Sequence, residues 1–315
     1  MSRLLTTVSA ITVIAGTYVN ADVPKVIADI APIHSLVSRV MDGVGEPKLI
    51  VPNETSPHDY RLRPADAQAI EDANLVFWMG EGLTPWMERA LEALNRDTDI
   101  VEFLALEEST RLSFREGALF EAHDDHDDHD DHDKEHDDHA GHDHGEFDPH
   151  AWLSTSNAKI WLNVIAAKLS SIDPNNAGIY FANASEARNE IDALDDEINA
   201  MLAPVRGGKF IVFHDAYQYF ETVYDFPASG AISLGDASDP SAARIAEIAD
   251  RIKRENIDCV LSEPQFNAGL VETVMGGTDA NTQVIDPLGF GIEPGSSLYP
   301  KLIRAMAKSL VDCLK

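Results

Sequence analysis

Three histidines far apart in the chain share a placement that could build one metal site. His58 and His214 each follow a predicted strand, and His150 opens the ordered stretch after an acidic segment. In open α/β sheets, ligand-binding groups gather beyond the carboxyl ends of the strands, where residues distant in sequence meet. The intervals from 58 to 150 and from 150 to 214 are 92 and 64 residues. These intervals exclude a local finger and suit a cleft between two lobes.

The three histidines favour zinc as the metal. Neutral imidazole suits zinc, and three protein ligands leave a fourth tetrahedral position for water or a carboxylate. Asp286 is the best carboxylate for that position, because it ends a predicted strand over 283–285 and precedes Pro287. Taken singly, each histidine is more often structural than a ligand, so the prediction depends on their common placement. His34, at a helix start after Pro32, is expected to be structural.

A low-complexity segment over residues 123–144, the His/Asp run, also indicates metal binding. Imidazoles suit zinc, copper and nickel, and interleaved carboxylates add charge without imposing one geometry. We expect weak binding at several sites, which protonation of imidazole opposes, within a disordered loop over 121–146. The alternative is a solvated acidic spacer. The eight histidines of the run are His123, His126, His129, His132, His136, His139, His142 and His144.

Charge excludes several classes of partner. The 315 residues include 24 Lys and Arg against 54 Asp and Glu, a formal net charge of −30. A nucleic-acid-binding protein needs clustered cations to neutralise phosphates, and anionic lipid would repel this chain. The negative charge is instead consistent with a protein that attracts cations.

The N-terminus and the cysteines indicate an oxidising, extracytoplasmic compartment. Residues 1–21 resemble a secretory signal peptide, with Arg3 before a mostly apolar stretch and Val19-Asn20-Ala21 as the cleavage site. The segment is short and polar for a transmembrane anchor. The only two cysteines, Cys259 and Cys313, are expected to form a disulfide worth about 4 kcal/mol in the loop-entropy model. Two buried free thiols are the alternative.

The elements that would position these residues alternate between strands and helices. Strands are predicted at 26–30, 47–52, 75–79, 99–104, 209–213, 257–261 and 283–285, and helices at 34–41, 64–73, 85–94, 242–255 and 298–314. This alternation predicts largely parallel sheets. The longest helix is predicted over 174–203, with Asp173 as its N-cap and Pro174 at its first position. We therefore predict two α/β lobes, residues 22–173 and 204–315, joined by that helix.

Several strings of residues resemble the zinc-specific solute-binding proteins of bacterial ABC importers, of the ZnuA type. The resemblance covers essentially the whole chain after the signal peptide. The strings are Ala31-Pro32-Ile33-His34-Ser35-Leu36, Ser56-Pro57-His58-Asp59-Tyr60 with Leu62-Arg63-Pro64, Phe213-His214-Asp215-Ala216-Tyr217-Gln218-Tyr219-Phe220, Ser262-Glu263-Pro264-Gln265-Phe266 and Ile285-Asp286-Pro287-Leu288-Gly289.

The resemblance implies two α/β lobes bridged by a rigid helix, with one metal in the cleft. The family's zinc histidines fall on His58, His150 and His214, and manganese-selective relatives carry Glu at the third position. Some zinc members use a Glu directly before the first histidine, where this chain has Pro57, which leaves water or Asp286 as the fourth ligand. The family's charged loop falls on the His/Asp run, and its disulfide, where present, on the two cysteines.

The resemblance implies a periplasmic receptor that captures Zn²⁺ and delivers it to an inner-membrane ABC permease. We expect a monomer that neither binds nucleic acid nor inserts in the membrane after signal cleavage, and no enzymatic activity. One alternative is a zinc-dependent hydrolase, with Glu263 as general base and a zinc-bound water as nucleophile. That alternative lacks a His-Glu-x-x-His string. A surface metal buffer or adhesin is a third possibility.

Overall fold

The structure, a computed structural model, describes residues 23–94, 98–115, 120, 146–233, 240–266 and 268–315. The predicted signal peptide and the His/Asp run lie outside these residues. No helix in the described part is both long enough and apolar enough to cross a membrane.

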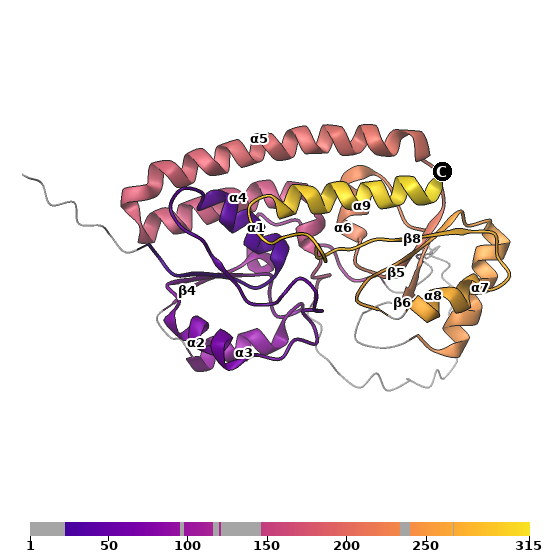
Figure 1. Cartoon of the computed structure of the whole chain (residues 1–315), viewed down its shortest axis with the longest axis horizontal. Coiled ribbons are helices and arrows are strands. Elements are labelled where there is room, and N and C mark those ends of the chain that lie inside the picture. The colour runs from indigo at the N-terminus through magenta and orange to yellow at the C-terminus, as the bar shows by residue number, and fades with distance from the viewer. Residues whose placement is uncertain (1–22, 95–97, 116–119, 121–145, 234–239, 267) are drawn as a thin grey trace, which may run out of the picture.

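The N-terminal lobe is built on a parallel four-stranded sheet with the strand order β2-β1-β3-β4. Helices α1 and α4 cover one face of this sheet, and α2 and α3 cover the other (Figure 1). The strands are β1 (Val26–Ala28), β2 (Lys48–Leu49), β3 (Leu75–Trp78) and β4 (Asp99–Glu102), and the helices are α1 (Ala31–Val40), α2 (Pro64–Asp72), α3 (Pro85–Leu94) and α4 (Thr155–Ile172). Short 3-10 turns lie at η1 (Phe103–Ala105) and η2 (Ala151–Leu153).

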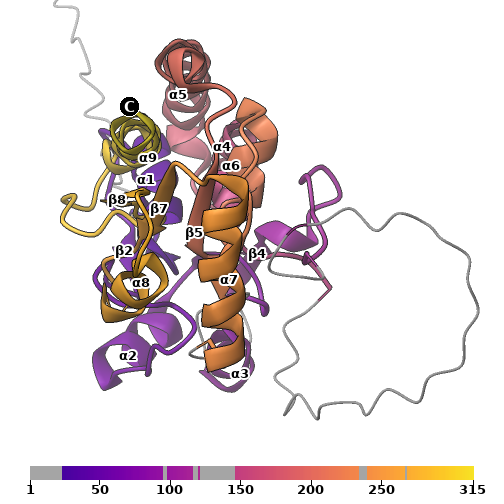
Figure 2. The same ribbon diagram turned by 90° about the vertical axis from the view of Figure 1, so that its right-hand side faces the viewer.

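The C-terminal lobe repeats the plan with a parallel sheet of order β6-β5-β7-β8. Its strands are β5 (Phe210–His214), β6 (Ala231–Ser233), β7 (Cys259–Ser262) and β8 (Asn281–Val284), and its helices are α6 (Gln218–Tyr224), α7 (Ala242–Glu255) and α8 (Ala268–Met275). Successive side chains of a strand point to opposite faces. Ile211 and Phe213 accordingly join a small core with α7 and α8, whereas Phe210 and Val212 join the main core. Figure 2 shows α7 and α8 beside these strands.

The long helix α5 (Ala177–Leu202) runs from one lobe to the other, as predicted (Figure 1). Its 26 residues span about 39 Å at 1.5 Å per residue. The predicted cap, Asp173 followed by Pro174, begins a 3-10 turn, η3 (Pro174–Asn176), which leads directly into α5, and Asn176 is the N-cap of α5 itself. The Asp173 carboxylate instead accepts a hydrogen bond from the Tyr180 hydroxyl at 2.8 Å, which ties the turn to α5. At its other end α5 runs into η4 (Ala203–Val205).

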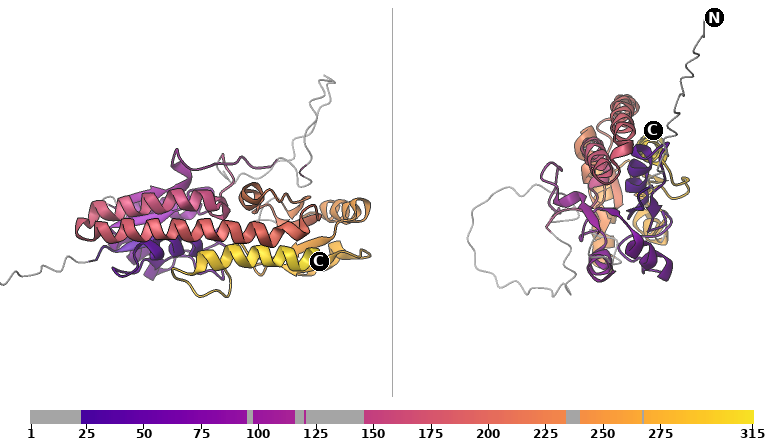
Figure 3. Two further views of the ribbon diagram at one scale, coloured as in Figure 1. Left: turned by 90° about the horizontal axis from the view of Figure 1, so that it is seen from above. Right: turned by 90° about the vertical axis from the view of Figure 1, so that its left-hand side faces the viewer.

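Helix α4 is an element that the sequence analysis did not predict. Its buried residues recur at helical spacing, with Ala158, Trp161, Leu162, Ile165, Ala166 and Leu169 on one side. Ser154 is its N-cap and accepts a hydrogen bond from the N–H of Asn157 at 3.2 Å. Both the stripe and the cap were present in the sequence as signals. Helix α4 packs along α5 (Figure 3), so α5 rests on a second helix rather than standing alone.

The C-terminal helix α9 (Leu298–Leu314) also joins the lobes. Near its start, the N–H of Tyr299 donates to the Ser35 hydroxyl of α1 at 2.9 Å. At its end, Cys313 is disulfide-bonded to Cys259 of β7, which confirms the predicted disulfide. The main hydrophobic core accordingly includes residues of α1, α4, α5, β5 and α9. The two sheets therefore share one core, which holds their carboxyl ends in a defined relation.

Candidate metal site

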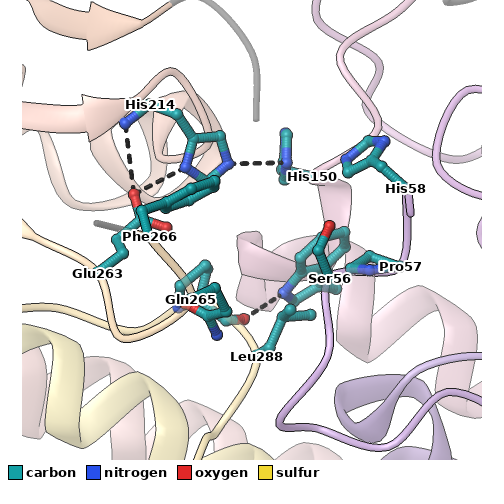
Figure 4. A pocket seen from close by; sticks show the side chains of 11 residues that line it. Ser56, Pro57, His58, His150, His214, Glu263, Gln265, Phe266 and Leu288 are labelled. Carbon is teal, nitrogen blue, oxygen red and sulfur yellow. Dashed lines mark hydrogen bonds and ion pairs between the residues drawn. The ribbon is translucent and has the colours of Figure 1, made fainter. Parts of the chain in front are cut away.

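The structure places His58, His150 and His214 around one small pocket (Figure 4). His58 lies in the loop after β2, His150 lies directly before η2, and His214 is the last residue of β5. The space that they enclose measures about 20 Å³, which is room for about one water molecule or ion. Its other lining residues are Ser56, Pro57, Trp152, Glu263, Gln265, Phe266, Pro287 and Leu288.

His150 and His214 stand at the spacing of two ligands on one zinc ion. Their Nε2 atoms are 3.4 Å apart, and their ring centres are 5.2 Å apart. Zn–N bonds of about 2.05 Å at the tetrahedral angle place two ligand nitrogens about 3.3 Å apart, and the ring centres about 5 Å apart. An ion seated between these Nε2 atoms needs little movement of either ring.

A buried carboxylate orients each of these two imidazoles. The Nδ1 of His150 lies 2.7 Å from Asp148 Oδ1, and the Nδ1 of His214 lies 2.7 Å from Glu263 Oε1. Asp148 is 1% exposed and Glu263 is 4% exposed. Because a carboxylate accepts, each Nδ1 carries a hydrogen, which leaves each Nε2 as the atom that would bind an ion in the pocket. Such carboxylate–histidine pairs fix the ring orientation of metal ligands and raise their basicity.

His58 reaches the pocket from the N-terminal lobe. The loop that carries it is tied on two sides, because Trp86 Nε1 donates to the Pro57 carbonyl at 3.0 Å and Asn53 Nδ2 donates to the Ile292 carbonyl at 2.9 Å. The ring centres of His58 and His150 are 6.0 Å apart, which exceeds the zinc-ligand spacing by almost 1 Å. Within the described residues, no three His, Cys, Asp or Glu side chains are close enough together to hold a metal as they stand.

Asp286, the predicted carboxylate ligand, follows β8 and does not line the pocket. Its Oδ1 accepts hydrogen bonds from the N–H of Leu288 at 3.0 Å and from Gln265 Nε2 at 3.2 Å. Burial raises the pKa of this carboxyl above its usual value, and these hydrogen bonds oppose the rise. Gln265 stands on the pocket wall in front of it, and the buried Oε1 of Gln265 accepts no hydrogen bond within the described structure.

The other nine histidines of the chain are His34 and the eight of the His/Asp run. His34 lies in α1 with its Nε2 3.1 Å from the Pro47 carbonyl, and burial lowers its pKa. This contact fits the predicted structural role. The eight histidines of the His/Asp run lie outside the described residues.

Two residues of the site carry roles that the sequence analysis did not assign. Glu263 entered only as the general base of a hydrolase, and Asp148 was not singled out. Asp148 could have been found locally, because it precedes His150 by two residues. No local signal links Glu263 to His214, which is 49 residues away in the chain.

Two parallel α/β lobes, joined by a long helix and meeting at a histidine-lined pocket, define a two-lobed solute-binding protein. The chain belongs to the ZnuA family, since the family described as "Zinc-uptake complex component A periplasmic" matches residues 26–313. It is 45% identical to the high-affinity zinc uptake system protein ZnuA of Brucella abortus (strain 2308), over 95% of this chain and 94% of that protein.

Further relatives agree in sequence and in fold. The protein of the same name from Paracoccus denitrificans (strain Pd 1222) is 42% identical over 94% of this chain and 93% of its own. A solved structure described as "Crystal structure of ZnuA" superposes with a TM-score of 0.73 at 23% identity, over 93% of this chain and 100% of that one. That likeness concerns the fold.

Proposed function

We propose that this protein captures Zn²⁺ outside the cytoplasm and delivers it to an ABC-type permease in the inner membrane. The observation that carries the proposal is the His150–His214 pair, with Nε2 atoms 3.4 Å apart and a buried carboxylate behind each ring. Membership of a family of zinc-uptake components supports the same conclusion. The predicted signal peptide and the disulfide fit an oxidising, periplasmic location.

His58, His150 and His214 are the protein ligands in this proposal. An all-nitrogen set favours zinc over manganese, because manganese prefers carboxylate and water oxygen. The fourth tetrahedral position is filled by water or by Asp286. Pro57 precedes His58 and offers no side-chain donor. Approach of the loop that carries His58 would complete the site, so ion binding and a small closure of the lobes would accompany each other.

The pocket suits capture of an ion without reaction. A hydrolase needs a general base that is free to act on the zinc-bound water. Glu263, the base suggested for a hydrolase, is bound to His214 Nδ1 and is 4% exposed. Turnover of ester, amide or phosphate substrates by the zinc-loaded protein would count against the receptor function.

The proposed site is tested by removing one ligand. We expect His214→Ala to lower zinc affinity by at least about 100-fold, because one nitrogen bond and the geometry of the pair are both lost. Titration against a chelator of known affinity measures this change. The matched control is His34→Ala, which removes a histidine that binds a backbone carbonyl outside the pocket. Equal affinity losses in the two variants would overturn the ligand assignment.

The His/Asp run is an accessory collector in this proposal. Its interleaved imidazole and carboxylate side chains do not specify one coordination geometry, so we expect them to bind divalent ions weakly and at several sites. The specific, tight site is the histidine pocket between the lobes.

A further inference from the structure

The chain on either side of the His/Asp run forms a short paired element, the stem, made of residues 112–115 and 147–150. The N–H of Asp148 donates to the Leu112 carbonyl at 2.8 Å, and Ser113 and Phe147 form an antiparallel bridge. The second half of the stem ends at His150. A ligand of the proposed zinc site is therefore part of this element.

The stem is bound to helix α6 of the C-terminal lobe. The hydroxyl of Tyr219 donates to the Asp148 carbonyl and accepts from the N–H of Leu112, each at 2.9 Å. Tyr219 is fully buried, so water does not compete for these bonds. His150 is thereby held on the same lobe as His214, although α4, which follows it in the chain after η2, covers the N-terminal sheet.

Arg115 connects the stem to the strand end that carries His214. Its Nε lies 3.0 Å from both carboxylate oxygens of Asp215. Its Nη1 and Nη2 donate to the two oxygens of Glu221 at 2.8 and 2.9 Å. The ring of Phe120 lies against the guanidinium, 3.5 Å from its central carbon. Arg115 thus makes bidentate hydrogen bonds to two carboxylates, a geometry that a lysine does not reproduce.

The two carboxylates that Arg115 binds are buried, so its positive charge stabilises them. Asp215 and Glu221 are 8% and 6% exposed, and Arg115 makes hydrogen bonds to both carboxylates. Burying carboxylates without a partner is strongly destabilising. Because Asp215 adjoins His214 and Asp148 binds His150, displacement of either carboxylate would move a histidine of the pair.

We propose that Arg115 is a positioning residue for zinc binding, which holds the His150 stem against the His214 strand and so keeps the two Nε2 atoms at ligand spacing before the ion arrives. A preformed pair loses less conformational freedom on binding. The inference rests on the proposed zinc function, and it also predicts that Arg115 fixes the positions of the two imidazoles in the metal-free protein.

The test compares Arg115→Met with Arg39→Met in the full mature chain. Arg39 is a matched control, because its guanidinium is also bidentate, to Glu190 at 2.8 and 3.2 Å, and its side chain is 15% exposed against 18% for Arg115. It joins α1 to α5, outside the pocket. We expect Arg115→Met to weaken zinc binding by roughly 10-fold, the lower end of the range for direct partners of metal ligands, because Arg115 acts through Asp215 and not on an imidazole itself. Arg39→Met should bind zinc as the unaltered protein does.

Two further measurements separate positioning from general stability. The Co²⁺-loaded Arg115→Met protein should show an altered d–d absorption spectrum, which reports ligand geometry. In the metal-free protein, the downfield Nδ1–H proton signals of His150 and His214 should shift. Unchanged zinc release, cobalt spectrum and imidazole signals would overturn the inference while leaving the zinc function intact. Failure of the unaltered protein to bind zinc would overturn the proposed function, and the imidazole signals would still decide the positioning role.

Arg115→Lys covers the case in which the methionine variant does not fold. Lysine keeps the positive charge and loses the bidentate grip. We expect this variant to fold. It should release zinc faster than the unaltered protein but more slowly than a protein whose stem is no longer bound to Asp215 and Glu221. Zinc release and imidazole signals identical to those of the unaltered protein would show that charge alone suffices, and would overturn the positioning role.

Discussion

At the scale of single residues, the site is a set of histidines whose second nitrogens are already bound. The sequence predicts the three histidines as a set because His58 and His214 each follow a predicted strand, where a parallel sheet presents its ligands, and His150 opens the ordered stretch after the acidic segment. It does not predict the partners of those histidines, apart from the local Asp148. The bond between His214 and Glu263 depends on how β5 and β7 lie next to each other, which only the folded sheet determines. The fourth ligand, water or Asp286, stays a prediction.

Glu263→Gln tests the contribution of the carboxylate behind His214. The amide keeps the size of the side chain and removes the charge that raises the basicity of the imidazole. We expect zinc affinity to fall about 10- to 100-fold, with the fold unchanged, as measured by chelator competition and by near-ultraviolet circular dichroism. Glu190→Gln, which alters an exposed carboxylate on α5, is the control and should bind zinc normally. An unchanged affinity for Glu263→Gln would show that the carboxylate only fills space.

At the scale of elements, the alternation of strands and helices and the long helix follow from the sequence, and their junctions do not. The predicted strand at 26–30 is shorter in the structure, where β1 ends at Ala28. Helix α1 begins at Ala31, three residues before its predicted start. Between them lies Asp29, which is 0% exposed. Periodicity identifies the middle of an element from its buried face, whereas its end depends on local contacts such as the one between Asp29 and the N–H of Ile30.

Asp29 binds the ends of neighbouring strands together. Its carboxylate accepts hydrogen bonds from the N–H of Ile30 and the N–H of Met79, each at 2.8 Å. Burial, the largest cause, raises its pKa from 3.8 to about 7 against the lowering effect of these bonds. The folded protein therefore holds this proton at pH values where the unfolded chain has released it.

This difference predicts a pH dependence of stability with a definite sign. A folded-state pKa above the unfolded value gives stabilisation that is complete below pH 3.8 and is lost as pH rises through about 7. The contribution lost amounts to roughly 4 kcal/mol at most. Urea unfolding at several pH values should show that Asp29→Asn lacks this part of the decline, although it is less stable at low pH because one of the two N–H groups loses its acceptor. Parallel stability profiles for the two proteins would contradict the raised pKa.

At the scale of the whole molecule, two lobes share a core through α5 and α9, and much of the charge lies in one segment. Two lobes and one linking helix are predictable from the alternation and from the long apolar stripe. The second connection, α9, is predictable only at its end, where the expected disulfide ties it to the strand of Cys259, because the helical pattern does not show that its start contacts the N-terminal lobe. Of the formal net charge of −30, residues 123–144 carry ten Asp and one Glu against one Lys, or −10. The excess of acid elsewhere in the chain therefore remains when the run is removed.

Deletion of residues 123–144 separates the two kinds of metal binding that we propose. The deletion removes eight histidines and leaves His58, His150 and His214 in place, so we expect one tightly bound zinc per chain with nearly unchanged affinity. The full chain should bind additional ions that are lost on dialysis or on acidification to about pH 5, where imidazole is protonated. Calorimetric titration with zinc, repeated with manganese, measures both the number of ions and their affinities.

Equal numbers of bound ions in the two proteins would refute a metal-binding role for the His/Asp run. Loss of the tight ion on deletion would instead move the specific site out of the pocket between the lobes and into the run.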